Sequence, residues 1–209
     1  IFFSGIEVDT LSIIKDSVRL LNFFSIIPVL LPNERCCGHD LLWTGDRENF
    51  ETLCRLNYQE FIAAGIEEVV VTCPECYHVL STYMPEVIPE FRIKVTLLID
   101  LLEREIKKGG VAFTPLKRKL TFQDPCRLGR ISGCFDTPRN LLAMVPQAKL
   151  KEMENSKRSA LCCGNNAFIN CDAYSKRVQV QRLREAKATN ADMLVTACPK
   201  CMIHLTCTM

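Results

Sequence analysis

The sequence predicts an α/β protein of two duplicated lobes, each a small parallel sheet flanked by helices. Short apolar runs such as 67–72 and 119–123 alternate with longer segments of helical periodicity, an order typical of parallel sheets covered by helices. Two cysteine motifs also recur at nearly constant spacing along the 209 residues, which indicates an internal repeat.

The first lobe is expected to run strand, helix, strand, helix, strand. Its strands are 1–5, 27–31 and 67–72, and its helices are 9–25 and 46–65. In the second helix Phe50, Cys54 and Phe61 recur at helical spacing. Gly65 ends that helix before the next strand. Cys54 is therefore expected in the core rather than among metal ligands.

The second lobe is expected to repeat this order. Its segments are 119–123, 137–145, 148–153, a helix over 172–188, and 192–197. The glycine-containing stretch 107–119 separates the two sets, which predicts lobes of 1–112 and 113–209. In parallel sheets, sites form beyond the carboxyl ends of the strands, so we expect the cysteine sites there.

Adjacent cysteines mark the repeat. The segments ERCCGHD and ALCCGNN match Cys36 and Cys37 to Cys162 and Cys163. A disulfide between neighbours is strained, because their Cα atoms lie only about 3.8 Å apart. Two thiolates this close repel one another unless a cation lies between them. A metal is therefore the natural partner of each pair.

A Cys-Pro-x-Cys motif follows each pair, after 35 residues in the first lobe and 34 in the second. In these motifs, Cys73 and Cys198 can occupy the N-cap of a helix and the proline its first position. Exposed N–H groups and the positive helix end then stabilise both thiolates of a motif. A thioredoxin-like dithiol is the rival interpretation, and the companion cysteine pairs weigh against it.

The second lobe offers one thiol more than the first. Its candidate ligands are Cys126, Cys162, Cys163, Cys198 and Cys201, and those of the first lobe are Cys36, Cys37, Cys73 and Cys76. Ile6 stands where a fifth thiol of the first lobe would lie. Four thiolates satisfy zinc or a cubane iron–sulfur cluster, so a fifth indicates a larger or more open group. In the first lobe both zinc and an iron–sulfur cluster remain open.

Composition describes an ordinary globular chain. Hydrophobic residues make up 48%, charged residues 24%, and the net charge is +2, which gives no sign of nucleic-acid binding. Thirteen cysteines in CC and CxxC patterns indicate metal or redox chemistry in a reducing compartment. Apolar runs are too short to span a bilayer. Ile1 already belongs to an expected strand, which indicates a segment of a longer chain.

Three further cysteines lie near the motifs. Cys171 follows the second CCG by a short loop, and Cys207 follows the second Cys-Pro-x-Cys by two helical turns. We expect both to serve in packing, although either could approach the metal group. Cys134 has no role that the pattern assigns.

Histidines and arginines also flank the motifs. His39, His78 and His204 are expected to be satisfied hydrogen-bonding residues, with a ligand or proton-donor role as the alternative. Arg127 and Arg130 could attract an anionic substrate, but as loop arginines they are expected to be solvated.

The repeated pattern C…CCG…CPxC resembles the cysteine-rich CCG domains of the heterodisulfide reductase family, over nearly all of the chain. That family includes a catalytic subunit and related subunits of glycolate, lactate and glycerol-3-phosphate oxidation. Its intact five-cysteine motif holds a noncubane [4Fe–4S] cluster where heterodisulfides are cleaved. The resemblance implies this cluster at the five second-lobe cysteines, and it identifies no catalytic residues in addition to the cluster. With Ile6 in place of cysteine, it implies zinc or a second iron–sulfur cluster in the first lobe.

The implied function is reduction of a heterodisulfide-type disulfide with electrons from partner iron–sulfur centres. A ferredoxin pattern is absent from the 209 residues, so the expected partners are a ferredoxin-type iron–sulfur protein, a flavoprotein or a membrane cytochrome. The expected location is cytoplasmic, with attachment to a membrane through a partner. The alternatives are an electron-transfer subunit between a flavin dehydrogenase, of hydroxy acids or acyl-CoA, and a quinone pool, or a structural zinc protein.

Overall fold

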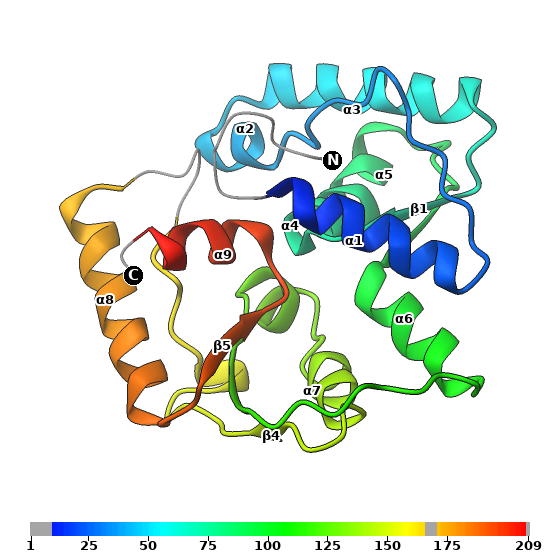
Figure 1. Cartoon of the computed structure of the whole chain (residues 1–209). Coiled ribbons are helices and arrows are strands. Elements are labelled where there is room, and N and C mark those ends of the chain that lie inside the picture. The colour runs from blue at the N-terminus through cyan, green and yellow to red at the C-terminus, as the bar shows by residue number, and fades with distance from the viewer. Residues whose placement is uncertain (1–9, 166–170, 208–209) are drawn as a thin grey trace. The chain divides into compact units, whose positions relative to one another are not determined.

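The computed structural model describes residues 10–165 and 171–207. The chain divides into two compact units, Ile1–Leu102 and Glu103–Met209, and each contains parallel strands with helices around them (Figure 1). This confirms the expected α/β class. None of the helices in the described residues is long and apolar enough to cross a membrane. The expected strand 1–5 and Ile6 lie outside the described residues.

The first unit contains two parallel strands, β1 (Glu68–Val71) and β2 (Lys94–Leu97), with Val69 opposite Val95. Its helices are α1 (Thr10–Phe23), α2 (His39–Thr44), α3 (Arg47–Ala63), α4 (Pro74–His78), α5 (Met84–Val87) and α6 (Leu98–Lys107), the last of which continues into the second unit. The expected elements 9–25, 46–65 and 67–72 are confirmed to within two residues at each end.

Helix α3 shows how the sequence specifies these elements. The Asp46 side chain accepts a hydrogen bond from the Asn49 N–H at 3.3 Å and so caps the helix. Phe50 and Cys54 are fully buried along one face, and Phe61 is nearly so. The expected core position of Cys54 is confirmed.

The expected strand 27–31 is wrong. Residues 26–31 form no strand, and Ile27 is 87% exposed. Pro28 and Pro32 remove backbone donors that a sheet would require, so the apolar residues between them cannot join a ladder.

The elements of the first unit that were not predicted include a strand and a helix in one segment. The segment KVTLLIDLLEREIK contains both β2 and α6, and Leu98 and Leu101 lie buried at helical spacing within it. A π-helical turn, η1 (Val79–Tyr83), joins α4 to α5. It directly precedes the turn that carries Pro85, a residue without the N–H that a regular helix needs.

In the second unit β3 (Lys119–Gln123) lies between β4 (Lys149–Leu150) and β5 (Met193–Thr196), parallel to both. The remaining elements are η2 (Arg127–Ile131), α7 (Asp136–Ala143), η3 (Lys157–Ser159), α8 (Ala173–Ala188) and α9 (Pro199–Thr206). The strand expected at 148–153 is reduced to two residues, although the Lys151 N–H still donates to the Leu120 carbonyl at 2.7 Å.

Strand β3 is buried on both faces. Leu120 and Phe122 on one face and Thr121 and Gln123 on the other are all at most 2% exposed. Because β3 and β5 are parallel and adjacent, their carboxyl ends lie side by side. The loops that carry Cys126 and Cys198 therefore start from neighbouring positions.

Candidate metal centres

The cysteines of the second unit are placed by the ends of its elements. Cys126 is the N-cap of η2, just after β3, and Cys198 is the N-cap of α9, just after β5. Pro199 occupies the first turn of α9, as the Cys-Pro-x-Cys motif predicts, and Cys201 lies one turn into the helix. Cys162 and Cys163 follow η3.

Side-chain hydrogen bonds link these five thiols in one continuous chain. The Cys162 side chain is hydrogen-bonded to those of Cys126 and Cys163. The Cys201 side chain is hydrogen-bonded to those of Cys163 and Cys198. The structure therefore brings together all five cysteines predicted for this site.

Negative charge collects on Cys162. Hydrogen bonds from Cys126 and Cys163 lower the pKa of its thiol to about 2, and the Gly164 N–H, 3.4 Å from Sγ, and the Arg130 cation act in the same direction. The same hydrogen bonds raise the pKa of the donors, that of Cys163 to about 12. One thiolate is thus held by its neighbours even before a cation is added.

Three of the five thiols are buried among apolar side chains, and the other two are partly exposed to solvent. Cys163, Cys198 and Cys201 are buried in an apolar cluster with Leu205, against which Leu183 and Leu194 pack. Cys126 and Cys162 are only partly buried. Within the described residues, Cys126 and Cys162 are therefore the two thiols of the set that are partly exposed to solvent.

The four cysteines of the first unit form a shorter chain of the same type. Cys37 interacts with Cys36 and Cys76, and Cys76 also with Cys73. Hydrogen bonds from Cys36 and Cys76, together with the His39 N–H, hold the pKa of the buried Cys37 thiol well below its usual range. Cys37 is thus the acceptor of this set, as Cys162 is of the second set, although Cys37 matches Cys163 in the repeat.

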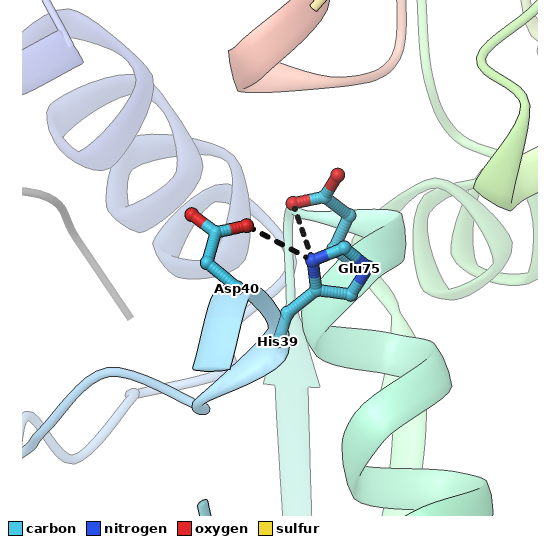
Figure 2. A group of neighbouring side chains, drawn as sticks. All are labelled: His39, Asp40 and Glu75. Carbon is cyan, nitrogen blue, oxygen red and sulfur yellow. Dashed lines mark hydrogen bonds and ion pairs between the residues drawn. The ribbon is translucent and has the colours of Figure 1, made fainter. Parts of the chain in front are cut away.

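A buried acid and imidazole group adjoins this first set (Figure 2). His39 Nδ1 lies 3.2 Å from Asp40 Oδ1 and 3.4 Å from Glu75 Oε2, and all three side chains are at most 15% exposed. His39 Nε2, which Figure 2 shows turned away from both carboxylates, is buried and has no hydrogen-bond partner among the residues that the structure describes. The expectation that His39 is fully satisfied is therefore wrong for one of its two nitrogens.

His204 agrees with expectation. It is fully buried, with Nε2 3.2 Å from Ser175 Oγ and Nδ1 3.8 Å from Cys171 Sγ. Burial, and next the nearby Lys176 cation, lower the pKa of its imidazole. His204 is therefore a neutral hydrogen-bonding residue. His78 packs its ring against Tyr83 at 5.0 Å.

A buried ion pair holds the loop after β3. Arg139 donates to both carboxylate oxygens of Asp124, at 2.8 and 2.9 Å, and also pairs with Glu152. Asp124 Oδ2 accepts the Lys157 N–H at 2.8 Å. Asp124 thereby connects the loop that carries Cys126 to η3, which leads to Cys162.

Two further side chains fix the segment before the CCG motif. Gln123 Nε2 donates to the Leu161 carbonyl at 3.3 Å, and its Oε1 accepts from the fully buried Arg182. Arg130 donates to the Ala160 carbonyl. Arg130 is exposed, as expected of a solvated arginine, and it makes this hydrogen bond in addition. Its partner lies 30 residues away, and no local pattern in the sequence indicates it.

Gly164 of the second CCG motif cannot be replaced without conflict. Its φ of +96° is in the left-handed region, and a Cβ would lie 2.5 Å from the Ser175 carbonyl oxygen. Gly38 of the first motif has φ +81°, but the atom nearest to its Cβ would belong to the Phe50 side chain, at 2.9 Å, and not to the backbone. The second motif therefore packs directly against the backbone of α8.

The expectation that Cys171 and Cys207 serve in packing is wrong. Both are exposed, whereas Cys134 is partly buried. Cys171 precedes the N-cap of α8 and Cys207 is the C-cap of α9, so neither lies on the buried face of a helix.

Comparison with known proteins agrees with this geometry. The profile of the CCG cysteine-rich domain family matches residues 15–81 and again 120–206, so it covers each cysteine set once and most of the chain. The chain belongs to the CCG domain family. Two CCG copies are therefore shown, as the repeat predicted.

Three relatives illustrate the kinds of protein to which this CCG protein is similar. It is 31% identical over 195 residues to one subunit of the dihydromethanophenazine:CoB–CoM heterodisulfide reductase from Methanosarcina acetivorans, a match that covers 90% of this chain and 48% of the relative. An uncharacterized iron–sulfur protein of Methanococcus maripaludis is 28% identical over 98% of this chain and 40% of its own length.

The third relative, EtfAB:quinone oxidoreductase of Syntrophomonas wolfei, is 29% identical over 88% of this chain and 27% of its own length. The CCG protein is thus homologous to iron–sulfur oxidoreductase subunits. The chain spans about half or less of the length of these relatives.

Gly164→Ala will disrupt the five-thiol set, because its Cβ would overlap the backbone of α8. Gly133→Ala is the matched control, since Gly133 also has positive φ (+71°) but open space around it. We expect the control to lose about 1 kcal/mol of unfolding free energy from backbone strain and Gly164→Ala at least about 2 kcal/mol more. Urea unfolding monitored by circular dichroism tests this, and equal losses would contradict it.

Asp124→Asn will leave Arg139 partly unpaired in a buried setting, since the Arg139 side chain is only 11% exposed. We expect a loss of about 3 kcal/mol in unfolding free energy. Asp136→Asn, which removes an exposed ion pair with Lys157, is the control and should change the value by less than about 0.5 kcal/mol. The idea fails if the two variants unfold at the same urea concentration.

Proposed function

We propose that this CCG protein is an iron–sulfur subunit of a heterodisulfide reductase-type oxidoreductase. The five thiols of the second unit hold a noncubane [4Fe–4S] cluster, and a disulfide is reduced there. The single observation that carries this is the continuous chain of five thiols, buried on one side and accessible on the other. Homology to the heterodisulfide reductase of Methanosarcina acetivorans supports the same assignment.

The spacing of the thiols favours a cluster over a single ion. Four thiolates around one zinc ion lie about 3.8 Å from one another, given a zinc–sulfur bond of about 2.3 Å. Among the ligand atoms of all His, Cys, Asp and Glu side chains within residues 10–165 and 171–207, three lie within 4.8 Å of one another only at His39, Asp40 and Glu75, and not at the cysteine sets. The thiols form open chains instead, which suit a group with several metal atoms.

The cluster, when bound, supplies electrons one at a time, so that a disulfide takes up two electrons and two protons and leaves as two thiols. The protein supplies the surroundings of this reaction. Buried Leu205, with Leu183 and Leu194 packed against it, keeps water from one side. On the other side, the Gly164 N–H and the Arg130 cation stabilise negative charge at Cys162, where a departing thiolate would also be stabilised.

The first unit holds zinc or a second iron–sulfur cluster at Cys36, Cys37, Cys73 and Cys76. Its four thiols are linked as those of the second unit are, with one member fewer. The open spacing of the thiols applies here too and favours the cluster.

Electron transfer alone is the second candidate. The relation to EtfAB:quinone oxidoreductase favours it, because that protein's name links a flavoprotein to a quinone. In this reading the same cluster passes electrons onward, between a flavin dehydrogenase and a quinone pool. Both readings require redox partners: a ferredoxin-type iron–sulfur protein, a flavoprotein or a membrane cytochrome. They place the protein in the cytoplasm, at a membrane where the partner is membrane-bound.

Iron and zinc analysis with EPR on anaerobically purified protein tests the cluster. Cys163→Ala, which removes a thiol bonded to two others, should abolish the second-unit signal and lower iron by about four atoms per chain. Cys37→Ala should remove only the metal of the first unit. Cys134→Ser, outside both sets, is the control and should keep the full metal content.

Addition of a disulfide separates the two candidates. If the second-unit cluster binds and reduces disulfides, its EPR spectrum changes on addition of a disulfide, and this change is absent in Cys163→Ala. A spectrum that never responds to disulfide or thiol would exclude the reductase role and leave electron transfer. Colourless protein with zinc and no iron would exclude both.

A further inference from the structure

Two exposed cysteines of the second unit stand outside the five-thiol set. Cys171 directly precedes Asp172, the N-cap of α8, and Cys207 caps the carboxyl end of α9. Their side chains are hydrogen-bonded to each other. Two accessible thiols in contact are able to close into a disulfide and open again.

The start of α8 and the end of α9 form a fixed frame for this pair, and the two lie close together in Figure 1. Ser175 Oγ is 3.2 Å from His204 Nε2, and the Gln179 side chain donates to the His204 carbonyl. Cys171 Sγ contacts the same imidazole at 3.8 Å. The two thiols therefore meet through packed helices and not through a chance contact of loops.

The environment makes the two thiols unequal. Lys176 Nζ lies 2.8 Å from Cys207 Sγ, and this contact is the main cause of a lowered pKa of the Cys207 thiol. Hydrogen bonds from Cys171 and Gln179 act in the same direction. Burial and the negative charge of Cys207 and Asp172 raise the pKa of the Cys171 thiol. Cys207 is the better nucleophile and Cys171 remains a protonated thiol.

We propose that Cys171 and Cys207 form a redox-active dithiol that exchanges with low-molecular-weight disulfides, with Cys207 as the attacking thiolate and Cys171 as the resolving thiol. This site goes beyond the proposed cluster and lies apart from its five ligands. The Lys176 ammonium group disfavours a metal cation and favours a disulfide that carries carboxylates.

The exchange proceeds in two balanced steps. The Cys207 thiolate attacks one sulfur of the disulfide, the S–S bond breaks, and one thiolate leaves. Cys171 then gives its proton to the solvent, from which a released thiolate can take one up, and attacks Cys207 Sγ; the mixed S–S bond breaks, the second thiolate leaves, and a Cys171–Cys207 disulfide forms. The substrate gains two electrons and the protein pair loses two. A dithiol reductant or two one-electron transfers from an iron–sulfur centre return the pair to its reduced form.

A single-turnover experiment tests this. Anaerobic, iron-loaded protein is mixed with 5,5′-dithiobis(2-nitrobenzoate), an anionic aromatic disulfide, and the released thiolate is followed by absorbance. We expect two thiolates per chain in the fast phase and a Cys171–Cys207 disulfide in peptide mass maps. Cys171→Ser should release one thiolate and keep a mixed disulfide on Cys207. Cys207→Ser should lose the fast phase.

Lys176→Met tests the positioning of the charge. Without the ammonium group the pKa of Cys207 rises, so less thiolate is present at neutral pH and the fast phase should slow about tenfold. Its rate–pH profile should move to higher pH, because the thiol then ionises only there. Cys134→Ser, a partly buried thiol of the same unit, should match the wild type in rate and stoichiometry.

Two results would overturn the proposal. One is a fast phase that survives in Cys207→Ser; the other is wild-type protein that carries its mixed disulfide on another cysteine. If Cys207→Ser does not fold, the mass map and Lys176→Met decide. Iron content and EPR should be unchanged in Cys207→Ser, so failure here leaves the proposed cluster intact, whereas loss of iron would show that Cys207 belongs to the cluster site.

Discussion

Mutual repulsion among thiolates is the constraint on which the rest of this structure depends. In the second unit the parallel strands β3 and β5 bring Cys126 and Cys198 to one edge of a sheet, where the negative charges of thiolates would push the loops apart. Both units respond in the same way. One thiol, Cys37 or Cys162, becomes the acceptor and its neighbours stay protonated donors, so the charge is concentrated on one sulfur. A multivalent cation can then replace the protons of the donors without moving the chain.

The frame that holds the thiols is itself polar. In the second unit, Asp124, Arg139, Gln123 and Arg182 lie almost entirely buried and tie the end of β3 to the segment before Cys162. Such buried polar side chains add little net stability compared with apolar residues. They nevertheless favour a single conformation of these loops, because any shift leaves a buried polar partner unpaired, which costs free energy. A ligand set that must fit a rigid group benefits from that uniqueness.

The sequence predicted the features that depend on residues close together in the chain, and it did not predict contacts between distant residues. The strand 119–123, the N-cap positions of Cys73 and Cys198, and the grouping of the thiols depended on spacing along the chain and were found. The expected strand 27–31 failed because its prolines outweighed its hydrophobicity. Contacts such as Arg130 with Ala160, or Lys176 with Cys207, join residues 30 or 31 positions apart, and no periodicity in the sequence marks them.

The two copies of the motif differ in the charged residues around their cysteines. A metal group bound in one copy would therefore differ from one in the other in how easily it is reduced. At matched positions of the Cys-Pro-x-Cys motifs, the first unit has Glu75 and the second has Lys200, which is buried. After the CCG motifs the first unit has His39 and Asp40, where the second has asparagines. Carboxylates beside a cluster resist the added negative charge of reduction, whereas a buried ammonium group stabilises it. In the proposed assignment of an iron–sulfur group to each unit, this difference in charge makes the group of the second unit the easier one to reduce.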